Sequence, residues 1–188
     1  LRQNYYRFYV DNDALDPTDP YPIGASDLGE NTSITGADDP LGETDRVRIR
    51  MSFHVNNASM PEATESLKLQ YGKRDTVCSA IGAWVDVGAP GDGTIWRGYN
   101  GSVTDGTALA TSTPATGTLN LSVSDAAGTY EDQNNSAVNP YAVDIGEDVE
   151  YDWMVEHNGA TQLSDYCFRA VKSDGTELSG YDNYPTLR

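Results

Sequence analysis

The sequence has no apolar run that approaches the roughly 18 residues of a membrane-spanning helix, and no stretch keeps a helical 3.6-residue period over three turns. It is also poor in basic residues, because 12 Lys and Arg stand against 29 Asp and Glu, a formal net charge of -17 at pH 7. A charge of this sign repels phosphate backbones and anionic lipid headgroups. We therefore expect no nucleic acid partner and no membrane insertion.

Signatures of catalysis are also missing. The two histidines are His54 and His157, and the chain lacks the G-x-S-x-G, H-E-x-x-H, P-loop and dinucleotide-binding patterns. Paired carboxylates suited to glycoside hydrolysis arise by chance among 29 acidic residues, so they discriminate nothing. The sequence predicts a protein that is not an enzyme.

Cysteine is scarce, with only Cys78 and Cys167. Two distant cysteines in an acidic, lysine-poor chain fit one long-range disulfide in an exported protein. Two free, buried thiols in a cytosolic protein are the alternative. The start at Leu1, without an initiator Met, also fits export, so the expected location is extracellular.

The clearest pattern that is present is the alternation of apolar and polar residues. Residues 45–55, DRVRIRMSFHV, and residues 149–156, VEYDWMVE, each read as a half-buried strand with its polar face outward. One polar face carries arginines and the other carboxylates, so pairing of the two strands would set their register by charge. Weaker strand candidates are residues 66–72, 83–87, 94–98, 118–123 and 165–171.

The opening segment NYYRFYV, residues 4–10, is apolar on both faces, with Tyr6 and Phe8 on one face and Tyr5 and Tyr9 on the other. Such a strand needs cover on both sides, either from its own chain or from a neighbouring copy. A strand lent to the next subunit would build a head-to-tail homopolymer. Docking in its own sheet is the alternative.

Eight strand candidates separated by Gly, Pro, Asp and Asn clusters predict an all-β fold, an antiparallel two-sheet sandwich of immunoglobulin-like or jelly-roll-like type with one disulfide. Its parts would be an N-terminal strand (1–10), donated or self-docked, a polar Pro-rich connection (11–44) and the sandwich itself (45–188). A connection this long is unusual unless it binds, links or detaches something.

Three groups of residues suggest ligands or modifications. Oxygen ligands at short spacing suit Ca²⁺, although Asx and Pro residues also simply make turns; the candidate ligands are Asp11, Asp13, Asp16 and Asp19. Covalent glycans would attach at N-x-Ser/Thr sequons, which occur at Asn31, Asn57, Asn100, Asn120 and Asn134. Trp96 and Tyr99, joined by Tyr181 and Tyr184, would stack on a sugar ring, or else serve as core residues.

The segments YYRFYVDNDALDPTDPYP, LGENT, VRIRMSF, LKLQYG, EYDWMV and DYCFRAV, in this order, resemble uncharacterised secreted surface proteins of environmental bacteria over essentially the whole chain. That resemblance implies an exported cell-surface β-sandwich with a Cys78–Cys167 bridge and no catalysis. A looser similarity to immunoglobulin-like sandwiches rests on Cys78, Trp84 and the pair Tyr166 and Cys167. The Trp follows the first Cys too closely for that pattern, and the Tyr adjoins the second Cys instead of preceding it by two residues.

Two functions are therefore expected. The first is a structural subunit of an extracellular fibre or pilus-like filament, assembled from copies of this chain by addition of the N-terminal strand. Its interface would consist of Tyr5, Tyr6, Phe8 and Tyr9. The alternative is a carbohydrate-binding or adhesive module that contacts surface glycans, with Ca²⁺ as a clamp. A secreted hydrolase has the least support, since no catalytic set can be named.

Overall fold

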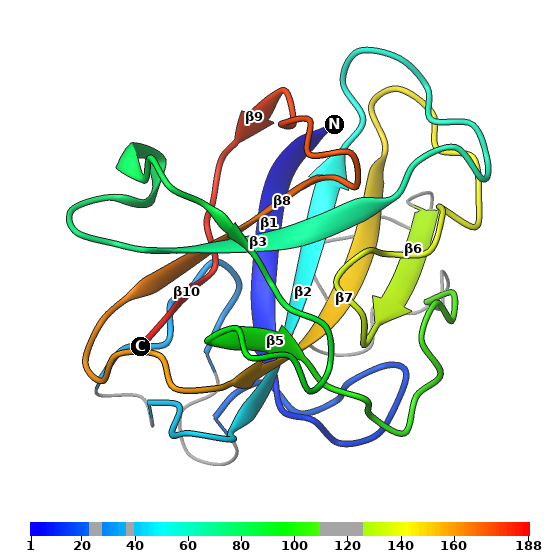
Figure 1. Cartoon of the computed structure of the whole chain (residues 1–188). Coiled ribbons are helices and arrows are strands. Elements are labelled where there is room, and N and C mark those ends of the chain that lie inside the picture. The colour runs from blue at the N-terminus through cyan, green and yellow to red at the C-terminus, as the bar shows by residue number, and fades with distance from the viewer. Residues whose placement is uncertain (23–27, 37–39, 110–125) are drawn as a thin grey trace.

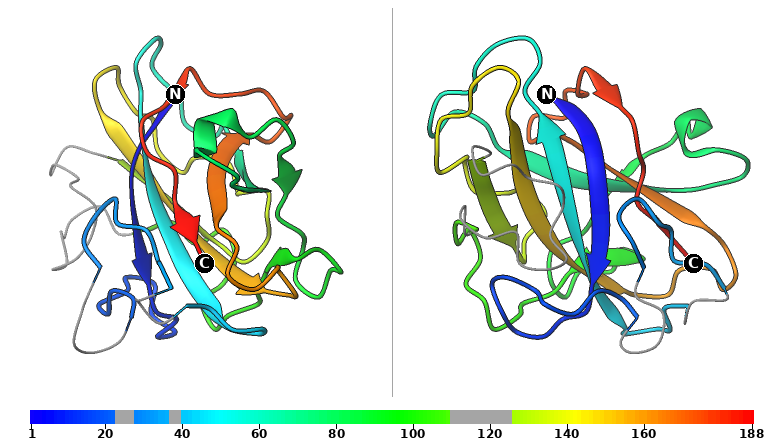
Figure 2. Two further views of the ribbon diagram at one scale, coloured as in Figure 1. Left: turned by 90° about the vertical axis from the view of Figure 1, so that its left-hand side faces the viewer. Right: turned by 180° about the vertical axis from the view of Figure 1, so that it is seen from behind.

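The chain folds into two β-sheets that pack face to face, as a computed structural model describes for residues 1–22, 28–36, 40–109 and 126–188 (Figures 1 and 2). The larger sheet contains β1 (Arg2–Tyr9), β2 (Arg46–His54), β5 (Trp96–Gly98), β6 (Ala126–Glu131), β7 (Asp148–His157) and β9 (Gly180–Tyr181). The smaller sheet contains β3 (Leu67–Lys73), β4 (Val85–Asp86), β8 (Tyr166–Lys172) and β10 (Thr186–Leu187). A short 3₁₀ turn, η1 (Cys78–Ala80), follows β3.

The predicted all-β sandwich is confirmed. The larger sheet has the order β5-β7-β2-β1-β9, with β6 also paired to β7, and the smaller sheet has the order β10-β8-β3-β4. Most neighbours are antiparallel as expected, but β6 pairs with β7, and β1 with β9, in parallel. The strands of the two sheets cross at a steep angle in Figure 1.

The alternating segments pair with each other as their charges predict. Ile49 lies opposite Trp153 and Met51 opposite Tyr151 along the antiparallel β2–β7 ladder. Their apolar faces meet the inner face of the smaller sheet and form the main core, where the sandwich excludes water. The largest apolar side chains of this core include Phe8, Phe53, Trp96, Tyr151, Trp153 and Phe168.

The polar face of β2 and β7 is not exposed, so that prediction was wrong. Arg48 and Arg50 are only 0% and 1% exposed. Parts of residues 11–21 and 99–109 lie over this face, where Leu15 packs beside Met154 and Tyr130 in a second apolar cluster. The larger sheet is therefore covered on both faces by its own chain.

The N-terminal strand β1 is likewise covered on both of its faces. This strand pairs with β2 along its length and with β9 at Arg2 and Gln3. A register shift lies between Gln3 and Tyr6. Tyr6 and Phe8 on one face and Tyr9 on the other are all buried, at 3%, 0% and 0% exposed. Both faces find their cover inside one protomer.

The connection from residue 11 to residue 44 is docked on the sandwich wherever it is described. Its apolar side chains Tyr21, Leu28, Ile34 and Leu41 belong to the main core. Backbone bonds attach it to both sheets: Asn31 N–H donates to the carbonyl of Tyr6 in β1, and Ile34 N–H donates to that of Thr186 in β10.

The two cysteines form the expected Cys78–Cys167 disulfide across 89 residues of sequence. Among the described residues, no helix is long and apolar enough to span a bilayer.

Candidate ligand-binding site

The outer face of the smaller sheet is the surface on which a cleft forms. Leu69 and Tyr71 of β3 and Phe168 of β8 point into the core. Strand geometry therefore turns the alternate residues, such as Gln70 and Arg169, to the opposite side.

One wall of this cleft is the loop that carries η1. The Cys78–Cys167 disulfide ties the loop to β8. The loop also packs directly on β3, because a Cβ atom at Gly72 would lie only 2.6 Å from Cγ2 of Ile81. A glycine at this position lets the loop lie close to the sheet.

The opposite wall is aromatic and comes from two segments. Trp84 leads into β4, whereas Tyr181 and Tyr184 lie on the segment that crosses from β9 in the larger sheet to β10 in the smaller sheet. The ring centroids of Trp84 and Tyr184 are 5.9 Å apart at an interplanar angle of 15°, and those of Tyr181 and Tyr184 are 5.6 Å apart at 22°. All three residues are half-buried.

Arg169 occupies the floor between these walls. Its guanidinium carbon lies 4.6 Å from the ring centroid of Trp84 and 5.6 Å from that of Tyr181. Its Nη1 donates to Glu177 over 2.7 Å, and its Nε donates to Gln70 over 3.0 Å. Carboxylate and rings thus hold the guanidinium in one orientation and balance its charge.

Together these residues line a cavity of about 450 Å³, which we name the Trp84 cleft. In Figure 2 (left), β8 lies between the loop of η1 and the segment that joins β9 to β10. Burial raises the pKa of Tyr181 and of Tyr184 above the ordinary value, so both hydroxyls stay protonated at neutral pH. The lining residues that bear on ligand binding are Gln70, Trp84, Arg169, Glu177, Tyr181 and Tyr184.

This combination suits an uncharged ligand that is rich in hydroxyl groups. The three rings pack against one another and against the Arg169 guanidinium, and the side chains of Gln70, Arg169 and Glu177 offer both donors and acceptors. A pyranose ring has this character, because it carries no charge and its hydroxyl groups project from the rim.

Of the predicted stacking residues, Tyr181 and Tyr184 line the Trp84 cleft, whereas Trp96 and Tyr99 lie elsewhere. Trp96 is 1% exposed and packs in the core against Tyr166 and Phe168, so its prediction as an exposed platform was wrong. It does contribute to the wall of another cavity, of about 440 Å³, beside His157. Tyr99 is half-buried under Arg46, whose guanidinium carbon lies 3.4 Å from the ring centroid.

The sequence analysis did not assign Trp84 to a binding site. Asp86, two residues after Trp84, accepts a bond from Gln70 on the outer face of the smaller sheet. Alternate residues of a strand share a face, so the phase of Trp84 with Asp86 is the signal that indicates the outer face.

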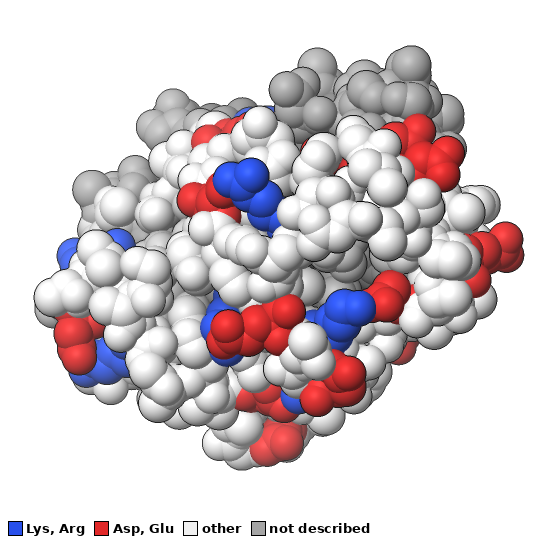
Figure 3. Space-filling view, turned by 90° about the horizontal axis from the view of Figure 1, so that it is seen from above, with Lys and Arg blue, Asp and Glu red and all other residues white. Residues whose placement is uncertain are grey.

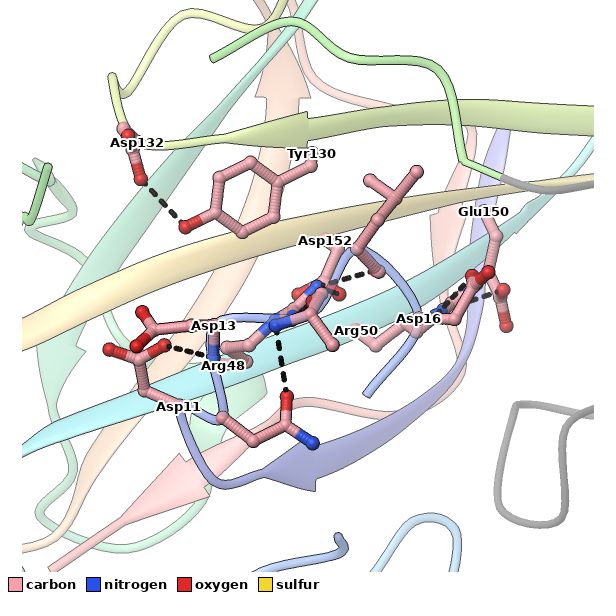
Figure 4. Close-up of polar contacts among 12 residues, drawn as sticks. Asp11, Asp13, Asp16, Arg48, Arg50, Tyr130, Asp132, Glu150 and Asp152 are labelled. Atoms are coloured by element: carbon pink, nitrogen blue, oxygen red, sulfur yellow. Dashed lines mark hydrogen bonds and ion pairs between the residues drawn. The ribbon is translucent and has the colours of Figure 1, made fainter. Parts of the chain in front are cut away.

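Two of the four aspartates proposed as calcium ligands, Asp11 and Asp19, accept bonds within their own loop. Asp11 accepts from the backbone N–H of Asp13, and Asp19 accepts from the side chain of Asn12. Asp16 lies 3.8 Å from Arg50 on the opposite side of the loop (Figure 4). Among the described residues, no three His, Cys, Asp or Glu side chains form a group that could hold a metal ion.

Beneath that loop lies a buried layer of charge on the outer face of the larger sheet (Figure 4). Arg48 pairs with Asp152 at 2.5 Å, and Arg50 pairs with Glu150 at 2.7 Å, with all four side chains at most 1% exposed. Arg48 also donates to the carbonyl of Leu15 over 2.9 Å. These bonds fasten the loop to the sheet and are structural.

The sequons divide into two groups. Asn57 and Asn100 are exposed. Asn31 accepts a bond from the backbone of Tyr6, and Asn134 accepts one from Leu69, so their side chains are engaged within the fold. Asn120 lies outside the described residues.

Comparisons of the chain with protein-family models, with curated proteins and with solved structures gave no significant match. The site is therefore interpreted from its own geometry.

Proposed function

We propose that this protein is an exported, non-catalytic carbohydrate-binding module and that the Trp84 cleft is its binding site. The observation that carries the proposal is the pairing of a half-buried aromatic wall with a fixed polar floor at Arg169. A pre-ordered site loses little conformational entropy when a ligand binds.

The charge distribution favours a neutral ligand. Arg169 is already paired with Glu177, and Lys68 beside the cleft is paired with Asp86 at 2.7 Å. On the face seen in Figure 3, basic side chains also lie next to acidic ones. With a net charge of -17, an anionic chain would be repelled.

Export agrees with the disulfide, since such bonds persist in oxidising compartments. An adhesive or substrate-targeting role outside the cell would follow from sugar binding. Among the sequons that the structure describes, Asn57 and Asn100 are the exposed ones and would carry the glycans in this proposal.

The filament hypothesis draws less support from the geometry. A donated strand would have to leave its place between β2 and β9 and expose Tyr6, Phe8 and Tyr9. Removing that much apolar surface from the core is costly. We therefore prefer the binding module, and the fate of a chain without β1 distinguishes the two.

Binding to a panel of immobilised neutral polysaccharides tests the proposal. Trp84→Ala and Tyr184→Ala should each weaken binding at least tenfold, whereas Trp84→Phe should keep much of it. Tyr141→Ala is the matched control, because Tyr141 is 47% exposed and does not line the cleft. The proposal fails if the unaltered protein binds no neutral polysaccharide, or if Trp84→Ala binds equally well.

A further inference from the structure

The loop of η1, which forms one wall of the Trp84 cleft, borders more than one cavity. A second cavity, of about 300 Å³, lies on the same loop, and both cavities are lined by Ile81 and Gly82. The second cavity adds the side chains of Lys73, Asp75 and Val77, all of them exposed. Ile81 and Gly82 thus border both cavities.

Gly82 keeps the boundary between the two recesses low. A Cβ atom built on this residue would meet no other atom within 4 Å, so the space above the boundary is open. The backbone of Gly82 is not in the left-handed region that requires glycine. The absence of a side chain here is therefore not needed for folding, and no side chain of residue 82 stands between the two cavities.

We propose that the ligand of this protein is an extended neutral polysaccharide chain that runs from the Trp84 cleft over Gly82 into the second cavity. This inference rests on the proposed function of the Trp84 cleft and defines the class of carbohydrate. Several sugar rings bind along such a path, and no single terminal sugar is required.

The chemistry of the second cavity supports a chain of the same character. Lys73 and Asp75 supply one donor and one acceptor of opposite charge, so the cavity has no net charge of its own from these two groups. Val77, 55% exposed, offers an apolar contact for a sugar face. Polar and apolar contacts thus continue beyond Gly82.

The experiment compares disaccharides and hexasaccharides of glucose, xylose and mannose by isothermal titration calorimetry. The unaltered protein should bind its preferred hexasaccharide at least tenfold more tightly than the corresponding disaccharide. In Gly82→Trp, whose indole would fill the space over residue 82, this ratio should fall to about one.

Gly93→Trp is the matched control, because a Cβ at Gly93 also meets no atom within 4 Å and Gly93 lines neither cavity. In this variant the ratio of hexasaccharide affinity to disaccharide affinity should stay unchanged. Lys73→Ala and Val77→Ala provide a second test at exposed positions, and each should weaken hexasaccharide binding without changing disaccharide binding.

The two proposals fail in different ways. If the unaltered protein binds no saccharide of either length, the proposed function is wrong and the chain ligand falls with it. If it binds disaccharide and hexasaccharide equally, or if both Gly82→Trp and the second-cavity variants keep the length dependence, the function stands and the extended path is overturned.

Discussion

Arg48 and Asp152 form an ion pair with both side chains 0% exposed. Charges at this depth are costly unless each has its partner, and removal of one partner typically costs about 3–5 kcal/mol. The pair also anchors the loop of residues 11–21 through the bond from Arg48 to Leu15. Its role is therefore to define one arrangement of that loop.

We expect Arg48→Met to lower the free energy of unfolding by about 3–5 kcal/mol in urea denaturation, because Asp152 is left charged without its partner. The double variant Arg48→Met/Asp152→Leu should regain most of the loss, since it leaves no unpaired charge. A loss below about 1 kcal/mol in the single variant would contradict this account of the buried pair.

Glu131 makes stability depend on pH. Burial, the largest cause, and the neighbouring Asp105 together raise the pKa of this carboxyl to about 8 from 4.5, although bonds from Thr129 and Ala137 act to lower it. The folded state thus retains a proton that the unfolded state releases above pH 4.5. The stability of the neutral form is present at low pH and is lost as pH rises toward 8.

Glu131→Gln should remove this dependence, because an amide remains neutral at every pH. We expect the free energy of unfolding of the unaltered protein to fall between pH 5 and pH 8, by at most about 1.4 kcal/mol per pH unit from this group, and the variant to show a flatter profile. Parallel profiles for the two proteins would show that Glu131 does not titrate in this range.

At the scale of single elements, β1 is the strand whose role was hardest to predict. The sequence correctly indicated a strand with two apolar faces, but it did not contain the register shift between Gln3 and Tyr6 or the identity of the cover. The cover comes from distant segments, such as Leu28 and Ile34, that pack against the core through tertiary contacts. Periodicity cannot report contacts of this range.

Deletion of residues 1–10 should therefore yield an unfolded or insoluble protein, because β2 would lose its neighbour and the core would lose Phe8. Circular dichroism and size-exclusion chromatography provide the measurement, with Tyr5→Ala as a milder control at a half-buried position. A soluble, folded monomer from the truncated chain would instead favour the strand-donation hypothesis.

The other strands differed in how well they could be predicted from the sequence. The segments of β2 and β7 alternate clearly, and their pairing followed from charge, with Arg50 opposite Asp152. β6 was missed because its residues AAGTYE are buried throughout and show no alternation. β9 and β10 have two residues each, which is too short for any period. The predicted strand at 118–123 lies outside the described residues.

The Cys78–Cys167 disulfide connects β8 to the loop that forms one wall of the Trp84 cleft. Cys78→Ala/Cys167→Ala should lower the free energy of unfolding by about 4–5 kcal/mol in the chain-entropy model for a loop of this length. It should also weaken ligand binding, because the loop with Ile81 loses its tie to β8. Denaturation and calorimetry measure the two effects separately. Unchanged affinity in a variant that is still folded would show that Ile81 packing alone positions this wall.

At the scale of the whole molecule, the net charge of -17 means that the salt dependence of binding reports the charge of the ligand. A neutral ligand releases no counterions, so its affinity should change less than twofold between about 50 mM and 500 mM NaCl, whereas a charged ligand would respond strongly. Titrations at several salt concentrations check this. A steep decrease of affinity with salt would indicate a cationic ligand and would contradict a neutral sugar.

Both faces of the larger sheet are packed, and the two walls of the Trp84 cleft lie on connecting segments outside the main ladders. Recognition and folding are thus carried by separate parts of the chain. A laboratory library that varies Ser79, Gly82 and Glu177, which all line the Trp84 cleft, while the β2–β7 ladder stays constant, should give new sugar preferences on an unaltered framework.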